Sequence, residues 1–163
     1  MRRGNLLAVV ALAPVLAFCQ VRPDYPKTPG EVVVAGKPMP ITAFWSSING
    51  SSLRYVTRLD GYLGFSKFQR LPLFDIKTVL KIEFLPFSDS EISTLKKQQN
   101  DFCKDPAQFC DLRRATVTFR SSSGRKALED IYVLLGLGTS KVYGFEGEEY
   151  ALTDRDVTAV SFK

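Results

Sequence analysis

Hydrophobic and polar residues alternate over much of the chain after residue 40, and this pattern predicts β-strands. The segment 52–68 alternates until Asp60-Gly61, a dipeptide typical of hairpin turns. The segment 115–138 has the same design, with a β-branched run, a Ser-Gly turn and a second hydrophobic run. Both segments are predicted to form antiparallel hairpins, so the chain is expected to be mainly β.

Short sequence matches relate two regions of the chain in the same order. The matched segments are 63–68 with 137–142, 73–75 with 152–154, and 79–84 with 157–162. Each copy would end in a strand with its hydrophobic residues on one face. The matches predict two related antiparallel β units, about 52–84 and 115–162, packed as a sandwich or small barrel.

A single short amphipathic helix is predicted between the two units, in the segment 88–102. Ser88 and Glu91 have the spacing of a capping box at its start. Ile92, Leu95 and Phe102 recur at helical spacing, so they are expected to form the buried stripe.

Cys103 and Cys110 follow this helix with Pro106 between them, and they are expected to form a disulfide in an oxidising compartment. The spacing differs from the C-x-x-C of thiol oxidoreductases, and the chain contains no histidine. A structural bridge is therefore favoured over a redox or metal site.

The N-terminus has the features of an export signal. Arg2 and Arg3 precede a hydrophobic run at 6–18, which is too short to span a bilayer comfortably. Residues 1–19 are therefore predicted to be a signal peptide. Residues 20–40 are expected to be an extended, proline-rich tether with a short strand at 31–34, and the single folded domain is expected at 41–163.

The tetrapeptide Leu16-Ala17-Phe18-Cys19 resembles the lipobox of bacterial lipoproteins. This resemblance implies that Cys19 is acylated and becomes the mature N-terminus, although Phe18 departs from the small residue usual at its position. The alternative is cleavage after Ala17, which leaves Cys19 as an unpaired thiol. Both alternatives place the protein in the periplasm or on the outer surface of a bacterial cell.

Composition narrows the function classes. The hydrophobic content of 45% is ordinary for a globular protein, and the net charge of +5 is too weak to indicate nucleic-acid binding. The absence of histidine removes Ser-His-Asp catalysis, Cys-His catalysis and the usual zinc ligands. No cofactor and no metal are predicted.

Carboxylates remain as candidates for chemistry, and their densest group is Glu146, Glu148 and Glu149, followed by Asp154 and Asp156. Such groups could act as a general acid and base or bind calcium. Their spacing matches no calcium loop, and the flanking glycines indicate a turn, so a solvated loop is the favoured interpretation.

Phe44 and the single tryptophan, Trp45, are adjacent on a predicted strand, so their side chains should lie on opposite faces. One ring is expected in the core. The other could be exposed for ligand contact. The alternative, which we prefer, is that the preceding tether covers both rings.

Charge is distributed unevenly between the two predicted units. Between residues 52 and 81 basic residues predominate, namely Arg54, Arg58, Lys67, Arg70, Lys77 and Lys81. Between residues 127 and 163 acidic residues predominate, including Glu146, Glu148 and Glu149. The two charged regions could meet within one molecule or promote association with a second copy or an envelope protein.

These features predict an exported, non-catalytic envelope protein that acts as a binding or assembly module. The alternative is a small periplasmic enzyme that uses carboxylates. Membrane attachment is expected only through a lipid at Cys19.

We predict that the mature chain begins between Phe18 and Gln20, because the hydrophobic run ends there. Intact-mass measurement on protein from the native host tests this prediction. A diacyl mass increment on Cys19 would identify a lipoprotein, whereas a mature chain that retains Met1 would contradict export.

Overall fold

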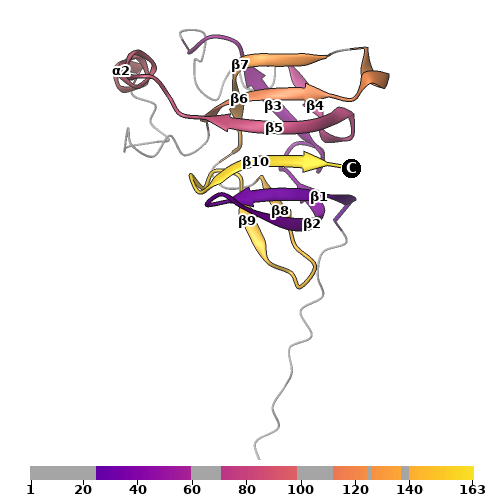
Figure 1. Cartoon of the computed structure of the whole chain (residues 1–163). Coiled ribbons are helices and arrows are strands. Elements are labelled where there is room, and N and C mark those ends of the chain that lie inside the picture. Colours follow the sequence, from indigo (N-terminus) through magenta and orange to yellow (C-terminus); the bar gives the residue numbers. More distant parts are fainter. Residues whose placement is uncertain (1–24, 60–70, 99–111, 125, 137–139) are drawn as a thin grey trace, which may run out of the picture.

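The computed structural model describes residues 25–59, 71–98, 112–124, 126–136 and 140–163. Over these residues the predicted fold class is confirmed: the protein is mainly β, with one α-helix between two groups of strands (Figure 1). The strands are β1 (Lys27–Val34), β2 (Lys37–Trp45), β3 (Ser52–Val56), β4 (Leu73–Asp75), β5 (Val79–Leu85), β6 (Leu112–Phe119), β7 (Ala127–Leu134), β8 (Lys141–Tyr143), β9 (Glu149–Ala151) and β10 (Val157–Phe162). The helix is α2 (Asp89–Gln98), and two short 3-10 turns are η2 (Ile76–Thr78) and η3 (Ser121–Ser123).

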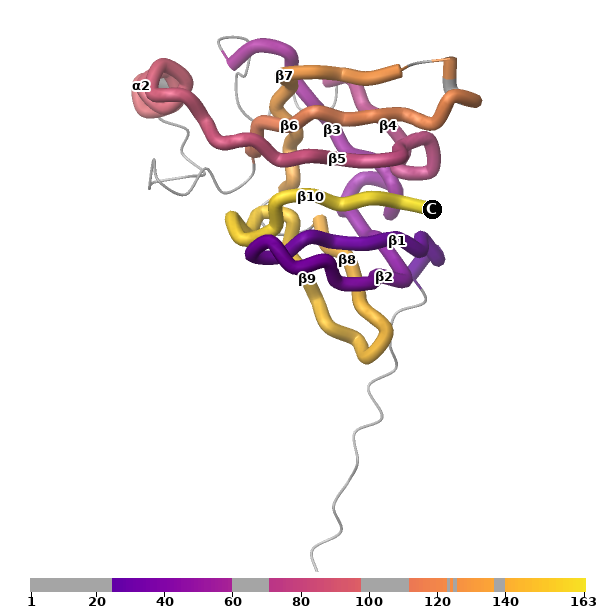
Figure 2. Tube along the Cα trace, in the orientation of Figure 1, coloured from indigo at the N-terminus to yellow at the C-terminus, as the bar shows by residue number. Residues whose placement is uncertain are grey.

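All ten strands belong to one antiparallel sheet with the order β4-β3-β7-β6-β5-β10-β1-β2-β8-β9. The sheet bends, so that β3 and β4 at one end and β8 and β9 at the other pass behind the central strands (Figures 1 and 2). This arrangement is sandwich-like, and it covers one face of the sheet with the sheet itself.

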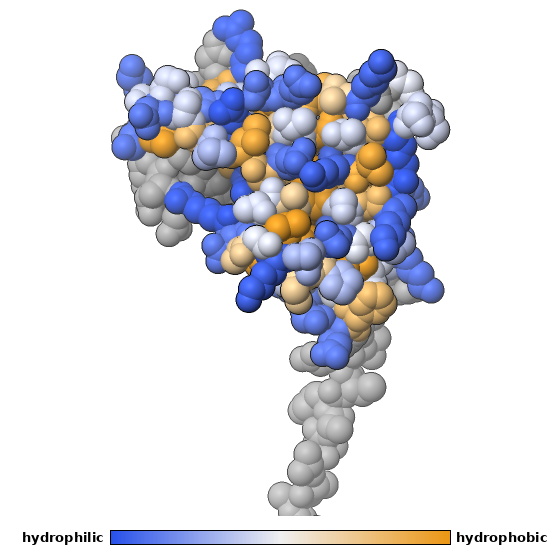
Figure 3. Space-filling view, in the orientation of Figure 1, coloured by the Kyte–Doolittle hydropathy of each residue, from blue (hydrophilic) through white to orange (hydrophobic). Residues whose placement is uncertain are grey.

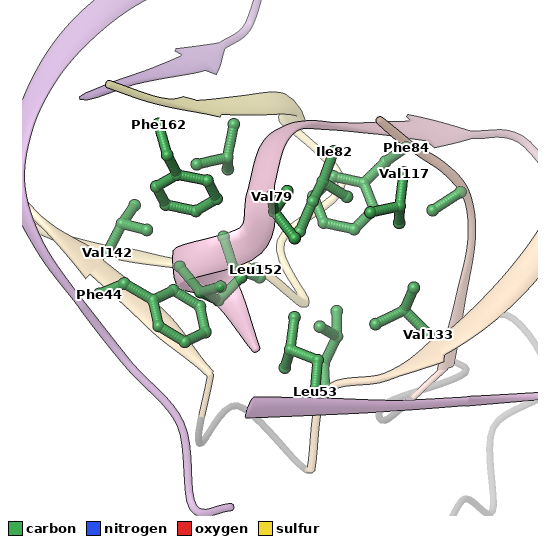
Figure 4. Packing of buried hydrophobic residues seen from close by; sticks show 14 of the residues in the cluster. Phe44, Leu53, Val79, Ile82, Phe84, Val117, Val133, Val142, Leu152 and Phe162 are labelled. Atoms are coloured by element: carbon green, nitrogen blue, oxygen red, sulfur yellow. The ribbon is translucent and has the colours of Figure 1, made fainter. Parts of the chain in front are cut away.

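The enclosed face forms the main hydrophobic core. Side chains from both ends of the sheet and from its centre belong to one cluster, including Leu53 of β3, Ile82 of β5, Val160 of β10 and Val142 of β8. Figure 4 shows Phe44, Val142 and Phe162 grouped around Leu152, with Ile82, Phe84 and Val117 further along the same core. Of the two adjacent aromatic residues, Phe44 is the one in the core, where it is 1% exposed.

The strand order of the sheet has an internal symmetry. When each strand is replaced by the one five places away in the chain (β1 by β6, β6 by β1, and so on) and the order is read in reverse, the same order results. The matched segments 79–84 and 157–162 lie on β5 and β10, which are neighbours at the centre of the sheet. Asp75 and Asp154, paired by the sequence matches, each accept a hydrogen bond from the backbone N–H two residues later, at 2.9 and 3.0 Å.

Two related units would produce this arrangement, so the internal repeat remains our inference. This symmetry relates the hairpin β6–β7 to the hairpin β1–β2. The sequence pattern instead relates the segment of β6–β7 to the segment 52–68.

The hairpin predicted from residue 115 is confirmed, because β6 and β7 pair antiparallel through η3 and Gly124, whose φ is 69°. The predicted helix and its capping box are also confirmed. The backbone N–H of Ser88 donates to Glu91 at 2.6 Å, and the N–H of Glu91 donates to the Ser88 hydroxyl at 3.4 Å. The expected turn at Asp60-Gly61 lies outside the described residues.

Residues 27–40, expected in the tether, pair within the sheet instead. β1 lies between β2 and β10, and the turn at Ala35-Gly36 has positive φ angles of 48° and 78°. Pro38 and Pro40 of β2 pair with β1, whereas the pairing of β2 with β8 covers only residues 43–45. At Pro38 and Pro40, the side of β2 away from β1 has no neighbouring strand, so the backbone N–H that proline lacks is not needed there.

Gly30 of β1 is required at its position, because a Cβ there would collide with the backbone carbonyl of Ser161 on β10. We predict that Gly30→Ala lowers the free energy of unfolding by about 1–3 kcal/mol or more, as overpacking does elsewhere. Urea denaturation measures the loss. Ser161→Ala, which removes an outward-facing hydroxyl on the same strand pair, is the control. Equal stability of the two variants would show that β1 and β10 approach each other less closely.

Candidate functional site

The most extensive polar network of the described residues joins α2 to the outer face of β6 and β7. Glu91 of α2 accepts hydrogen bonds from the Tyr132 hydroxyl on β7 and from the Ser88 hydroxyl, the latter at 2.7 Å. Arg114 of β6 lies 3.6 Å from Glu91 and 2.7 Å from Asp130. The network therefore links the helix to two neighbouring strands.

A second hydrophobic cluster lies beside this network and is separate from the main core. Its buried members are Val56, Leu59, Leu112, Tyr132 and Leu134. Phe87 stacks on the ring of Tyr132 with 6.2 Å between centroids, and Leu95 of α2 packs against the same cluster. The helix is thus held by both hydrophobic burial and polar contacts.

Asp130 adopts a left-handed backbone conformation with φ 49°, next to irregular pairing between β6 and β7. Aspartate tolerates this conformation better than most residues. The local distortion places the Asp130 carboxylate within hydrogen-bond distance of the Arg114 guanidinium, at 2.7 Å.

The electrostatics of the network favour a charged glutamate and a neutral tyrosine. Burial alone would raise the pKa of Glu91, but hydrogen bonds from Tyr132 and Ser88 and the charge of Arg114 outweigh it and lower the pKa. Burial and the bond to Glu91 raise the pKa of Tyr132 to about 12. Glu91 is therefore poorly suited to act as a general acid or base near neutral pH.

Arg113, the neighbour of Arg114, faces the opposite side of β6 and reaches the main core. Its Nη1 donates to the backbone carbonyls of Leu152, Asp154 and Val157 at 3.0, 2.8 and 2.7 Å. Its guanidinium lies 4.0 Å from the centre of the Phe84 ring. Burial lowers the pKa of Arg113 to about 10, so it remains charged at neutral pH and fixes the turn before β10.

The acidic segment predicted to be a solvated loop forms the turn between β8 and β9 and the start of β9, and Glu146, Glu148 and Glu149 are exposed. Glu149 forms an ion pair with Lys141 of β8 at 2.7 Å. Phe145 beside them is 69% exposed. We call Phe145, Glu146, Glu148 and Glu149 the acidic hairpin tip. Asp154 and Asp156 lie in the separate turn before β10. No group of three or more acidic or cysteine side chains in the described part of the chain could hold a metal ion.

Trp45 lies on the outer face of β2, opposite the buried Phe44. Tyr25, which precedes β1, lies 6.3 Å from Trp45 and stacks on Tyr143 of β8, with centroids 4.4 Å apart and planes 14° apart. Burial and the contact with Tyr25 raise the pKa of Tyr143. Tyr25, in the segment expected to be a tether, therefore covers Trp45 in part, whereas Phe44 is buried in the main core.

The structure brings together few of the basic residues singled out in the sequence. Arg54 of β3 donates to the carbonyl of Leu71 at 2.8 Å, and Arg58 follows the same strand. Lys67 and Arg70 lie outside the described residues, as do Cys19, Cys103 and Cys110. The lipid anchor and the disulfide remain predictions.

The face shown in Figure 3 is largely hydrophilic, with hydrophobic residues in small areas separated by charged ones. No helix within the described ranges is long and apolar enough to cross a membrane.

We predict that Tyr132→Phe lowers the free energy of unfolding at pH 7 by about 1.5–3 kcal/mol, because a hydrogen bond to a charged group is lost. Since the pKa of Glu91 is lowered in the folded state, this bond stabilises the fold above the ordinary glutamate pKa and is weakened as Glu91 becomes protonated in acid. The difference between variant and wild type should therefore shrink as pH falls.

Urea denaturation across a pH series measures this difference. Glu83→Gln is the control, because Glu83 forms an exposed ion pair with Lys81 that contributes little. A loss for Tyr132→Phe that is the same at every pH would mean that packing, not the bond to Glu91, accounts for it.

Comparison with known proteins assigns no family to the chain, because no family model, curated protein or solved structure matches it.

Proposed function

We propose that the protein is an exported, non-catalytic binding or assembly module of a bacterial envelope, and that the acidic hairpin tip is its partner-binding surface. The observation that supports this proposal is the exposed Phe145 among glutamates at the end of a hairpin. Large hydrophobic side chains exposed beside charges are common at protein-binding sites.

Hydrogen bonds within the hairpin tip restrain its conformation without a partner. The Gly144 N–H donates to the carbonyl of Glu148 at 2.9 Å, and the backbone N–H of Glu146 donates to the Glu148 carboxylate, also at 2.9 Å. Gly147 has a φ of 90°, which other residues rarely adopt. Because the loop is already ordered by these bonds, binding would cost less conformational entropy.

Two features of the hairpin tip define the partner's chemistry. Phe145 suits a hydrophobic socket, as aromatic anchors do in other interfaces. The surrounding carboxylates favour lysine and arginine around that socket and would increase the association rate at low salt. We therefore expect a basic protein surface as the partner, either an envelope protein or a second copy of this chain.

The alternative function, an enzyme that uses carboxylates, has less support. Glu91 is bonded to Tyr132 and Ser88 and close to Arg114. The acidic residues between 146 and 156 are divided between the β8–β9 hairpin and the turn before β10. A pair of carboxylates for acid and base catalysis would have to converge on one substrate.

A photo-crosslinking amino acid at position 145, introduced in the native host, tests the proposal. We expect a discrete protein adduct that depends on position 145 and weakens when Glu146 is replaced by glutamine. Glu149 is left unchanged, because it is already paired with Lys141 at 2.7 Å. An adduct of twice the chain mass would identify a second copy as partner.

The same crosslinker at Leu73 is the control, because Leu73 is also hydrophobic and exposed but lies on β4 at the other edge of the sheet. With the partner purified, Phe145→Ala should weaken binding by about 30-fold, as loss of an aromatic anchor does. Identical adducts from both positions, or none from position 145, would contradict the proposal.

A further inference from the structure

Basic residues occupy one end of five neighbouring strands. Lys27 begins β1, Lys163 follows β10, Lys77 lies in η2 just before β5, Arg120 follows β6, and Lys126 precedes β7. These strands are consecutive in the sheet order β7-β6-β5-β10-β1. We call these five residues the basic row.

Backbone contacts show that the five residues lie together, at the ends of adjacent strands on one side of the sheet. The N–H of Lys163 donates to the carbonyl of Pro29 at 2.8 Å, and the N–H of Arg120 donates to that of Thr78 at 2.9 Å. The N–H of Phe119 donates to the carbonyl of Lys126 at 3.0 Å. Since neighbouring strands lie about 4.8 Å apart, the row spans roughly 20 Å.

The row presents its charges to solvent. Lys27, Lys77, Lys126 and Lys163 are exposed, and Arg120 is half-buried. Asp75, the acidic residue closest in sequence to Lys77, uses its carboxylate to accept the backbone N–H of Lys77 at 2.9 Å. Four exposed lysines along these strand ends favour an anionic partner with an extended surface.

Aromatic residues lie at the same end of the sheet. Trp45 is the last residue of β2, and Lys27 of β1 pairs with Ala43 two residues before it. Tyr25 lies two residues before Lys27 and packs against Tyr143 and Trp45. Tyrosine and tryptophan favour the boundary between lipid and water, where basic side chains also bind anionic headgroups.

We propose that this end of the sheet lies against a membrane surface that contains anionic phospholipids. The inference rests on the proposed envelope location and adds a contact to it. The chain before Tyr25 contains the hydrophobic run 6–18 and Cys19. Six residues span at most about 20 Å, so a lipid on Cys19 would keep Tyr25 and Lys27 near the bilayer.

The acidic hairpin tip is oriented compatibly with this docking. β8 is antiparallel to β2, with Lys141 beside Trp45 and Tyr143 beside Ala43. The chain therefore moves away from the Trp45 end of β2 as it approaches Glu146 and Glu148. The acidic hairpin tip is therefore not expected to lie between the basic row and the bilayer.

The test uses purified mature protein and vesicles of phosphatidylcholine alone or in equal parts with phosphatidylglycerol. We expect stronger flotation with the anionic vesicles and a blue shift of Trp45 fluorescence, with both effects weakened by salt. Replacing Lys27, Lys77 and Lys126 by glutamine should reduce partitioning to anionic vesicles about 100-fold, since three basic contacts are lost.

The matched control replaces Lys37, Lys96 and Lys97 by glutamine, which changes the net charge equally at exposed sites away from the row. Equal loss in the two triple variants would overturn the inference. Equal binding of an unlipidated Cys19→Ser variant to both vesicle types would overturn it as well. Phe145→Ala should bind vesicles normally, so failure of the partner-binding proposal would be recognised separately.

Discussion

The fold depends on covering one hydrophobic face of a ten-stranded sheet with the sheet itself. The central strands β5 and β10 are joined by backbone pairing, so the two groups of strands belong to one sheet and share one core. Neither group could bury its hydrophobic face without the other. Arg113 stabilises this closure from β6, because its guanidinium bonds three carbonyls around the start of β10 and lies on Phe84.

Elements that depend on neighbouring residues were predictable from sequence, whereas distant pairing was not. The β6–β7 hairpin and the capping box of α2 have local signals in their turn and cap residues. The position of β1 between β2 and β10 depends on contacts across the whole chain, such as Gly30 with Phe162. Pro38 and Pro40 prevented the prediction of β2 from the sequence, because proline fits in a strand only where one side of the strand is unpaired.

The polar network could be predicted only in part. Ser88 and Glu91 have a local pattern, but the partners Tyr132 and Arg114 come from strands far along the chain. One signal was present: adjacent residues on a strand face opposite sides, so Arg113 and Arg114 could not both face solvent on a sheet with one covered face. One of them had to be buried with its charge bonded, as Arg113 is.

Charge separation in this protein follows the ends of the sheet and not the segments of the sequence. Of the basic region expected between residues 52 and 81, Arg54 forms a local backbone bond and Lys77 belongs to the basic row, whose five residues lie at the ends of five strands. Antiparallel pairing makes this possible, because it brings strand starts and strand ends together at one edge. If these strand ends lie on an anionic membrane, repulsion from the lipid surface keeps the acidic hairpin tip directed away from it. The tip is then exposed on the side where a basic protein can approach.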